Sequence, residues 1–309
     1  LKPEQINELK NEIQIVTSEY QNPAIFLDEY ESDILKTESA IEKNKEAKIL
    51  IIEDNPSLLD MLTKIFETFY TVITASNGAE GWEKVQSEHP NLILSDVIMP
   101  KLSGTELCKL IKENLDTCHI PVILLTAQTA IEHNLEGLRI GADDYITKPF
   151  NINILLSRCN NLVNNRIMLQ EKFSKQPQAT PQILATNILD KAFIDQAMKI
   201  IEQHLDDTNF NVDIFAREMS IARTKLFNKL KDITGQTPYE FIITVRLKRA
   251  AFMLKNNPEL NISEIADHLG FSSPRQFTKS FKAKFHVIPQ VYRKGEIYNN
   301  KEDEAAEEE

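Results

Sequence analysis

The sequence predicts two domains: a doubly wound α/β domain built on a five-stranded parallel sheet, and after it a domain made only of helices. Three observations lead to this fold class. Short apolar runs alternate five times with amphipathic stretches of helix length between residues 47 and 165. Residues 190–294 show helical periodicity interrupted by short turns. Between them, residues 166–189 are polar and rich in Gln, which is typical of a linker.

The alternating pattern determines how the first domain is connected. The apolar runs expected to be strands are Ile49–Ile52, Val72–Ala75, Leu92–Leu94, Val122–Leu125 and Tyr145–Ile146. The stretches expected to be helices are Pro56–Phe69, Gly78–Glu88, Thr105–Glu113, Ala130–Arg139 and Ile152–Val163. Because a helix follows each strand, the strands are expected to be parallel and joined by crossovers. Such a sheet binds its ligands at the carboxyl ends of its strands.

Charge is distributed unevenly along the chain. Of its 309 residues 42% are hydrophobic, enough for real cores, and the net charge is −11. Residues 191–294 carry +6, whereas residues 1–46 and 295–309 carry −6 each. We expect the first of these acidic segments to be a tether and the second to be a disordered tail. The local positive charge meets the first requirement for binding a polyanion, although many basic domains are merely soluble ones.

Cysteine usage and hydropathy limit the class of protein further. The three cysteines, Cys108, Cys118 and Cys159, are odd in number and scattered, which fits neither a disulfide framework nor a zinc site. We therefore expect a reducing compartment, the cytoplasm. No apolar run reaches the roughly 18 residues of a membrane helix. The first residue is Leu1, so we expect a fragment of a longer parent chain, which could be anchored in the inner membrane.

Polar residues follow the predicted strands at one edge of the sheet. The first run ends in Glu53 and Asp54, the third in Asp96 and the fourth in Thr126, and Lys148 follows the fifth. Three carboxylates at such an edge repel one another unless a cation lies among them, and oxygen ligands suit Mg²⁺. A carboxylate can attack a phosphoryl group while a metal ion and a lysine neutralise the transferring oxygens. The pattern therefore predicts an aspartyl-phosphate site that uses Mg²⁺.

Each of these residues taken singly is more often part of a solvated loop or turn, and only their positions at successive strand ends favour a site. Haloacid-dehalogenase-like phosphatases also use an aspartate nucleophile with Mg²⁺ on a doubly wound sheet. Those enzymes need a second aspartate two residues after the nucleophile, where this chain has Ile98. The sequence argues against that class.

Residues 47–165 resemble the receiver domain of response regulators, which has a flavodoxin-like fold. The residues that carry the resemblance are Ile49–Asn55, Leu94–Pro100 with Gly104, Leu124–Ala127 and Gly141–Phe150. The resemblance implies that Asp96 is the phosphoacceptor and that Thr126 and Lys148 bind the phosphoryl group. It implies Mg²⁺ on Glu53, Asp54, Asp96 and the backbone carbonyl of Ile98. It also implies that Thr126 and Tyr145 form a conformational switch.

The helical domain contains the same plan twice. Asn211–Gly235 and Asn261–Phe285 each read as a helix, a tight turn and a second helix, with matching residues 50 or 51 positions apart. Two copies do not make a solenoid. Helices with basic outer faces fit the major groove, whereas a plain helical bundle would leave such faces merely solvated. The residues expected to contact DNA are Arg223, Thr224, Lys225, Asn228, Lys229, Ser273, Arg275, Gln276 and Lys279.

Residues 190–294 resemble the AraC-type transcription regulators. The most specific match is in the second copy, Ile265–Pro274 followed by Phe277, Phe281 and Phe285. Two positions depart from the family pattern. His286 stands where glycine is usual, which brings the end of that helix into question, and Gln276 stands where an aromatic residue is common.

The order of domains resembles the C-terminal end of hybrid two-component systems of Bacteroides-type bacteria. We expect a transcription regulator that a histidine kinase phosphorylates, that binds double-stranded DNA, and that forms a homodimer on phosphorylation. The alternative is the phosphotransfer portion of a hybrid sensor histidine kinase in which DNA binding is secondary. The sequence leaves open whether the parent chain is an enzyme.

Overall fold

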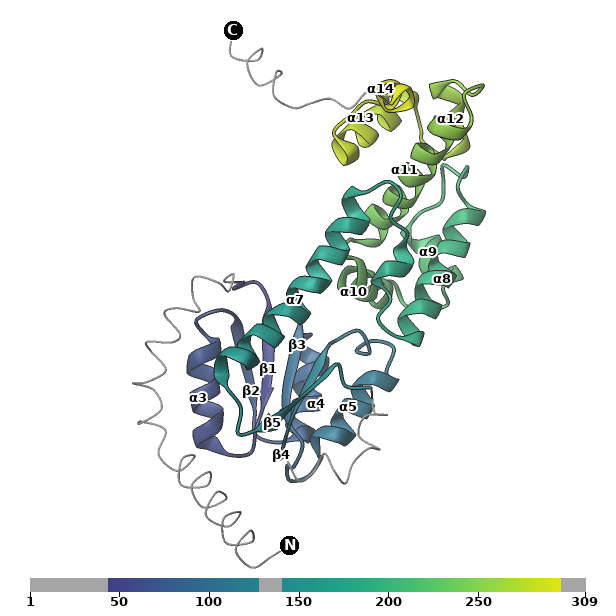
Figure 1. Ribbon diagram of the computed structural model, residues 1–309. Coiled ribbons are helices and arrows are strands. Elements are labelled where there is room, and N and C mark those ends of the chain that lie inside the picture. Colours follow the sequence, from purple (N-terminus) through teal and green to yellow (C-terminus); the bar gives the residue numbers. More distant parts are fainter. Residues whose placement is uncertain (1–43, 128–140, 296–309) are drawn as a thin grey trace, which may run out of the picture. The chain divides into compact units, whose positions relative to one another are not determined.

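The computed structural model describes residues 44–127 and 141–295 of the chain. The chain divides into two compact units, residues 1–165 and residues 166–309, and each is described by itself (Figure 1). The predicted helix Ala130–Arg139, most of the tether and nearly all of the tail lie outside the described residues. No helix among the described residues is long and apolar enough to cross a membrane.

The first unit is a five-stranded parallel sheet in the order β2-β1-β3-β4-β5. This confirms the predicted doubly wound fold. The strands are β1 (Lys48–Ile52), β2 (Thr71–Ala75), β3 (Leu92–Asp96), β4 (Val122–Ala127) and β5 (Asp144–Lys148). The helices described in this unit are α3 (Pro56–Phe66), α4 (Gly78–Glu88), α5 (Gly104–Glu113) and the start of α7 (Ile152–Lys175).

Two apolar layers cover the two faces of the sheet. On β1, Ile49 and Ile51 pack with residues of α3 and α7, whereas Leu50 and Ile52 pack with residues of α4 and α5. Successive residues of a strand point to opposite faces, so a strand buried on both sides is apolar at every position. This explains the unbroken apolar runs of the sequence. It also leaves the carboxyl ends of the strands as the edge where polar groups gather.

The segment predicted to be a linker differs from that expectation. Helix α7 continues to Lys175, and a short 3₁₀ helix, η2 (Pro181–Leu184), follows it. Phe173 is fully buried in the core of the second unit and packs against Phe241, with ring centroids 5.8 Å apart. The side chains of Arg166 and Gln170 donate hydrogen bonds to the backbone carbonyl of Asp232. Polar residues of this segment therefore hydrogen-bond to the backbone near the C-terminal end of the helix Arg223–Thr234. The expectation of a flexible spacer is wrong for this segment.

The second unit is helical, as predicted. After η2 it contains α8 (Ile188–Gln203), α9 (Val212–Glu218), α10 (Arg223–Thr234), α11 (Pro238–Asn256), α12 (Ile262–His268), α13 (Pro274–Phe285) and α14 (Pro289–Lys294). One core gathers residues of α8, α9 and α10, and a second gathers residues of α12 and α13. Helix α11 supplies buried residues to both cores, Phe241 to the first and Leu247 to the second, so it joins the two helix-turn-helix motifs (Figure 1).

A buried arginine ties the two motifs together at α11. The guanidinium of Arg246 donates to the backbone carbonyls of Gly270, His204 and Asp207 at 2.9, 3.1 and 2.7 Å. Gly270 adopts φ +61°, and a Cβ on it would lie 2.8 Å from a guanidinium nitrogen of Arg246. Glycine at this turn is therefore required both by the backbone and by the arginine.

His286, which departs from the family pattern, ends α13 with the same backbone conformation that a glycine would adopt there. His286 follows α13 in the left-handed region, φ 60°, and its N–H donates to the Lys282 carbonyl at 2.8 Å. The same cap in the first motif is made by Gly235 at φ 71°. A non-glycine residue tolerates this conformation at a cost in strain. The substitution thus leaves the geometry of the cap intact.

Candidate functional site

Three carboxylates and one lysine meet at the carboxyl edge of the sheet. Lys148 Nζ lies 2.8 Å from Glu53 Oε2 and 3.0 Å from Asp96 Oδ2. One carboxylate oxygen from each of Glu53, Asp54 and Asp96 lies within 4.8 Å of the others. The ends of β1, β3 and β5 supply these groups, as the alternating pattern predicted. The structure therefore brings together the four charged residues expected to form the site.

The backbone around Asp96 fixes its orientation. The N–H of Val97 donates to Asp96 Oδ1 at 2.7 Å, which leaves Oδ2 facing Lys148. A Cβ on Gly104 would lie 1.9 Å from the Asp96 backbone oxygen, so only glycine lets the start of α5 pass this close to the strand end. Gly104 belongs to the receiver-type motif of the sequence, and close packing against Asp96 is the physical reason for a glycine there.

Burial sets the electrostatics of the site. Glu53 is 2% exposed, and burial raises the pKa of its carboxyl, while the Lys148 ammonium opposes the rise and Asp96 adds to it. Asp54 lies on the exposed side of the cluster. A carboxylate that is costly to ionise and is surrounded by other carboxylates gains from a further cation. The all-oxygen donor set fits Mg²⁺ in chemistry and is open to solvent on one side.

The remaining receiver-type residues lie around this edge. Thr126 is 4% exposed, at the end of β4 beside the residue pair Ala127 and Lys148. Tyr145 is half-buried on β5, and burial raises the pKa of its phenol. The side chain of Ile98 is a hydrocarbon without a ligand atom and is 68% exposed, so only its backbone carbonyl could serve the cluster. Metal binding by the Ile98 carbonyl stays a prediction.

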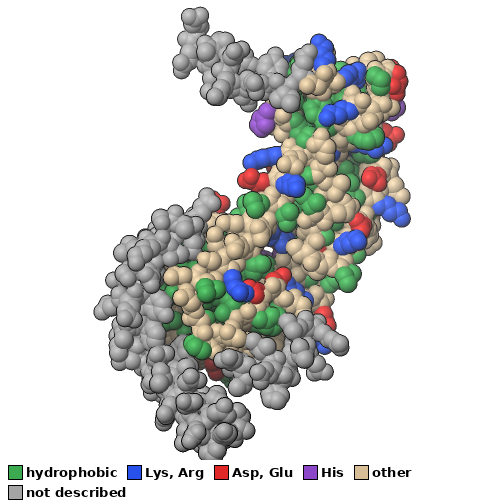
Figure 2. All heavy atoms as spheres, in the orientation of Figure 1, with side chains coloured by type: hydrophobic (Ala, Val, Ile, Leu, Met, Phe, Trp, Pro, Cys, Tyr) green, Lys and Arg blue, Asp and Glu red, His purple; other side chains and the backbone are tan. Residues whose placement is uncertain are grey.

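The expected DNA-contacting residues lie on α10, on α13 and at the N-terminus of α13. Arg223, Thr224, Lys225 and Asn228 are exposed on α10, and Arg275, Gln276 and Lys279 are exposed on α13. Ser273 is half-buried because it caps α13, accepting a hydrogen bond from the Gln276 N–H at 3.2 Å. On the face drawn in Figure 2, Lys and Arg side chains are spread over the surface of this unit among Asp, Glu and uncharged groups. Eight of the nine expected residues are thus at the surface or at a helix cap.

Lys229 is the exception, because it is buried. Its side chain is 2% exposed, and its Nζ lies 2.7 Å from Oδ1 of Asp190, which is 0% exposed. The expectation that Lys229 lies on the outer face of α10 is wrong. Lys229 lies three positions after Leu226 and four before Ile233, which places it on the buried face of α10. Its partner on α8 is 39 positions away, and no local pattern could have identified it.

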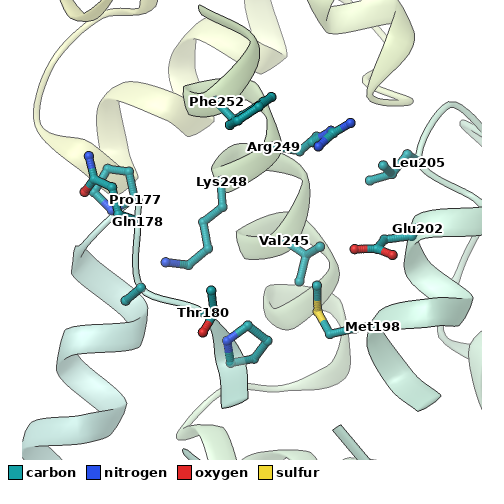
Figure 3. Close-up of a pocket in the computed structure, with 12 residues that line it drawn as sticks. Pro177, Gln178, Thr180, Met198, Glu202, Leu205, Val245, Lys248, Arg249 and Phe252 are labelled. Carbon is teal, nitrogen blue, oxygen red and sulfur yellow. The ribbon is translucent and has the colours of Figure 1, made fainter. Parts of the chain in front are cut away.

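A separate hollow of about 420 Å³ lies within the second unit (Figure 3). It is lined by residues of α8, of α11 and of the segment 177–181 together with Leu205, and none of the expected DNA-contacting residues is among them. Lys248 projects into it, with Nζ 4.7 Å from the ring centroid of Phe173, and donates to the Gln176 carbonyl. Burial lowers the pKa of Lys248 to about 8. These contacts attach residues 176–181 to α11.

Comparisons with known proteins agree with this geometry. A family model described as the response regulator receiver domain matches residues 49–160, and one described as a helix-turn-helix domain matches residues 215–295. Histidine kinase P4 of Formosa agariphila is 41% identical over 256 residues, which is 83% of this chain and 19% of that protein. The DNA-binding dual master transcriptional regulator RpaA of Synechocystis is 28% identical over 216 residues, 68% of this chain and 88% of that protein.

Among solved structures, the signal receiver domain of a signal transduction histidine kinase from Syntrophus aciditrophicus is 38% identical. It covers 38% of this chain and 91% of its own, with a TM-score of 0.37. The chain spans about a fifth of the length of the Formosa relative. The family matches agree with the sheet topology and acidic edge of the first unit and with the two helical motifs of the second. The chain contains a response-regulator receiver domain followed by an AraC-type helix-turn-helix domain, the composition of a response-regulator transcription factor.

Proposed function

We propose that Asp96 accepts a phosphoryl group from a histidine kinase and that this modification activates DNA binding by the second domain. The observation that carries the proposal is the Lys148 ammonium, which lies within 3.0 Å of both Glu53 and Asp96 in a cluster of three carboxylates. A lysine so placed lies beside the carboxylate oxygen that would attack phosphorus, where it can neutralise charge on the transferring oxygens.

The chemistry follows from the two oxygens of Asp96. Oδ1 is held by the Val97 N–H, and Oδ2 attacks phosphorus as the bond from phosphorus to the donor nitrogen breaks. The donor imidazole takes up a proton as it leaves. Lys148 then neutralises charge on the transferred oxygens, and the Thr126 hydroxyl donates to one of them. Glu53, Asp54, Asp96 and the carbonyl of Ile98 would hold Mg²⁺, which when bound supplies further positive charge at the phosphoryl group.

Phosphorylation is proposed to act through dimerisation of the receiver. Thr126 moves toward the phosphoryl oxygen, and Tyr145 fills the space it leaves, which reshapes the face around Tyr145–Ile146 and the start of α7. The other part expected for this face, Ala130–Ile140, lies outside the described residues. Ile154 on α7 is 55% exposed, so part of this surface is apolar and solvated in the single chain. Pairing of receivers raises the effective concentration of the DNA-binding domains at a paired operator.

Mass spectrometry after treatment with a small phosphodonor and Mg²⁺ tests the phosphoacceptor. One phosphate should be added at Asp96, and none in Asp96→Asn. Asp60→Asn serves as a matched control, because Asp60 is exposed on α3 and pairs only with Lys64 among the described residues. Phosphate at another residue of the unmodified chain would refute the assignment.

Sedimentation with and without a phosphoryl mimic tests the dimerisation step. The phosphorylated form should show the stronger monomer–dimer association. If both forms associate equally and DNA affinity still rises on phosphorylation, a release mechanism within one chain replaces dimerisation.

A second candidate is the phosphotransfer portion of a hybrid sensor histidine kinase in which DNA binding is secondary. The observation favouring it is the 41% identity to a protein named as a histidine kinase. Binding to promoter DNA separates the two. A regulator should bind specific DNA with an affinity that falls steeply with salt, because phosphate contacts release counterions. A chain that lacks such binding at low salt belongs to the second class.

A further inference from the structure

We propose that Gln276 reads the major groove only as a hydrogen-bond donor, and that it selects guanine over adenine at the base it contacts. The inference rests on the proposed DNA binding and deepens it. Gln276 is the third residue of α13 and is exposed. Its position at the start of a recognition helix is the part of a helix-turn-helix motif that reaches base edges.

The carbonyl oxygen of the Gln276 side chain is already bonded within the motif. Oε1 lies 2.6 Å from Ser272 Oγ and 3.1 Å from the backbone nitrogen of Ser272. A backbone N–H can only donate, so the atom that faces it must be the oxygen of the amide. This identifies which end of the amide is held and which end is presented outward.

The count of donors and acceptors then decides which hydrogen bonds the Gln276 side chain can still make with a base. An amide oxygen has two lone pairs, and Ser272 supplies a donor to each of them. The amide nitrogen carries two hydrogens, and no acceptor for them is found in the part of the chain that the structure describes. In this rotamer Gln276 therefore offers donors and no acceptor.

Occupation of both lone pairs of Oε1 removes the usual preference of glutamine for adenine. Glutamine reads adenine by donating to N7 and accepting from N6, and the second bond needs a lone pair on Oε1. Guanine presents two acceptors side by side, N7 and O6, and accepts from the amide nitrogen without any help from the oxygen. Adenine loses one of its two bonds, and cytosine, which presents a donor, gains none.

The first motif presents the same kind of group at the same place. The offset of 51 residues that aligns the recognition helices pairs Gln276 with Lys225, the third residue of α10. A lysine ammonium donates and cannot accept. Both motifs thus place a donor-only side chain at the third position of the recognition helix, by different chemistry.

Selection of bound sequences from a random duplex library, with the full phosphorylated chain, tests the inference. The base contacted by Gln276 is the one whose preference disappears in Gln276→Ala. In the unmodified chain that base should be guanine, favoured over adenine by about tenfold. Ser272→Ala restores one lone pair and should lower that ratio several-fold. Gln276→Glu should turn the preference toward cytosine, because a carboxylate accepts from cytosine N4.

The control is Ser263→Ala, a serine of α12 in the same motif, which should leave the ratio unchanged. Adenine at the contacted base, no base affected by Gln276→Ala, or a ratio unaffected by Ser272→Ala each overturns the inference while DNA binding stands. A chain that selects no sequence at all overturns the proposed function instead.

Discussion

The two helix-turn-helix motifs share a sequence plan but hold their recognition helices in different ways. In the first, α10 is fixed from behind by the buried pair of Lys229 with Asp190, and its N-cap, Ala222, makes no side-chain hydrogen bond. In the second, α13 is fixed at its tip, where Ser273 caps the helix and Ser272 binds Gln276. A repeat in sequence therefore does not imply a repeat in the interactions that stabilise it.

The two recognition helices, α10 and α13, also differ in the kind of contact that packs behind them. Behind α13, Phe277, Phe281 and Phe285 contact one another in sequence, with ring centroids 5.7 and 4.9 Å apart, and Tyr292 packs on Phe281. This stack needs no polar partner, because aromatic edges and faces satisfy each other. The Lys229–Asp190 pair is the reverse case, since two buried charges are costly unless they are paired, and here the Asp190 carboxylate also accepts a hydrogen bond from Asn187 at 2.8 Å. The first motif should consequently be the one that is more strongly destabilised when a single polar residue is replaced.

The largest expected effect comes from removing one member of the buried pair. Asp190→Ala leaves the Lys229 ammonium buried without its carboxylate, which should lower the free energy of unfolding by about 4 kcal/mol. Urea denaturation of the second domain measures the change. Asp195→Ala on the same helix is the control, because Asp195 is exposed. Combining Asp190→Leu with Lys229→Met should recover most of the loss. If the single and double variants are equally unstable, packing and not charge explains the site.

Arg246→Ala should have the next largest effect, because it leaves the carbonyls of Gly270, His204 and Asp207 without their common donor. We expect a loss of about 3 kcal/mol. Loss of cooperativity between the two motifs should accompany it: the variant should show two thermal transitions, and the unmodified domain should show one. The neighbouring Arg249→Ala, on the exposed side of α11, should keep a single transition. A single transition at an unchanged temperature in Arg246→Ala would show that α11 alone couples the motifs.

A smaller effect is expected on DNA binding when the two exposed arginines are compared. Arg275→Ala should weaken binding by about 2 kcal/mol if the side chain reads a base. Arg223→Ala should cost less, because Asp213 lies 2.8 Å from its guanidinium and competes with DNA for it. Titration of each variant with the selected operator at one fixed salt concentration gives the two values. Equal losses would mean that both arginines contact only phosphates.

The smallest effect concerns the helix caps. Ser273→Ala should reduce the free energy of unfolding by about 1 kcal/mol, whereas Ala222→Ser should raise it by up to about 1 kcal/mol. Thermal unfolding of each variant without DNA makes the comparison. Should Ala222→Ser bring no gain, the first recognition helix is already held fully by the contacts behind it.

Much of the fold followed from the sequence because its signals are local. The apolar runs of β1 to β5 and the polar groups at their ends, Glu53, Asp96 and Lys148, follow from the two-residue period of strands and the parallel connection. Local signals failed where a partner was distant in sequence. The length of α7 depends on Phe173 finding Phe241, and the burial of Lys229 depends on Asp190. Rotamer-level features, such as Ser272 binding Gln276, depend on side-chain positions that a one-dimensional pattern does not contain.

The attachment of both motifs to α11 has a consequence for the arrangement of bases in an operator. Helix α11 is 19 residues long, about 28 Å, and Arg246 fixes the turn of the second motif to the end of α8. Inserting one base pair between two sites on B-form DNA shifts one by about 3.4 Å and rotates it by about 35°. The connection through α11 and Arg246 is too rigid to rotate one motif by that angle relative to the other. If both motifs bind DNA as proposed, the protein would therefore measure the helical phase between two base sequences as well as the sequences themselves.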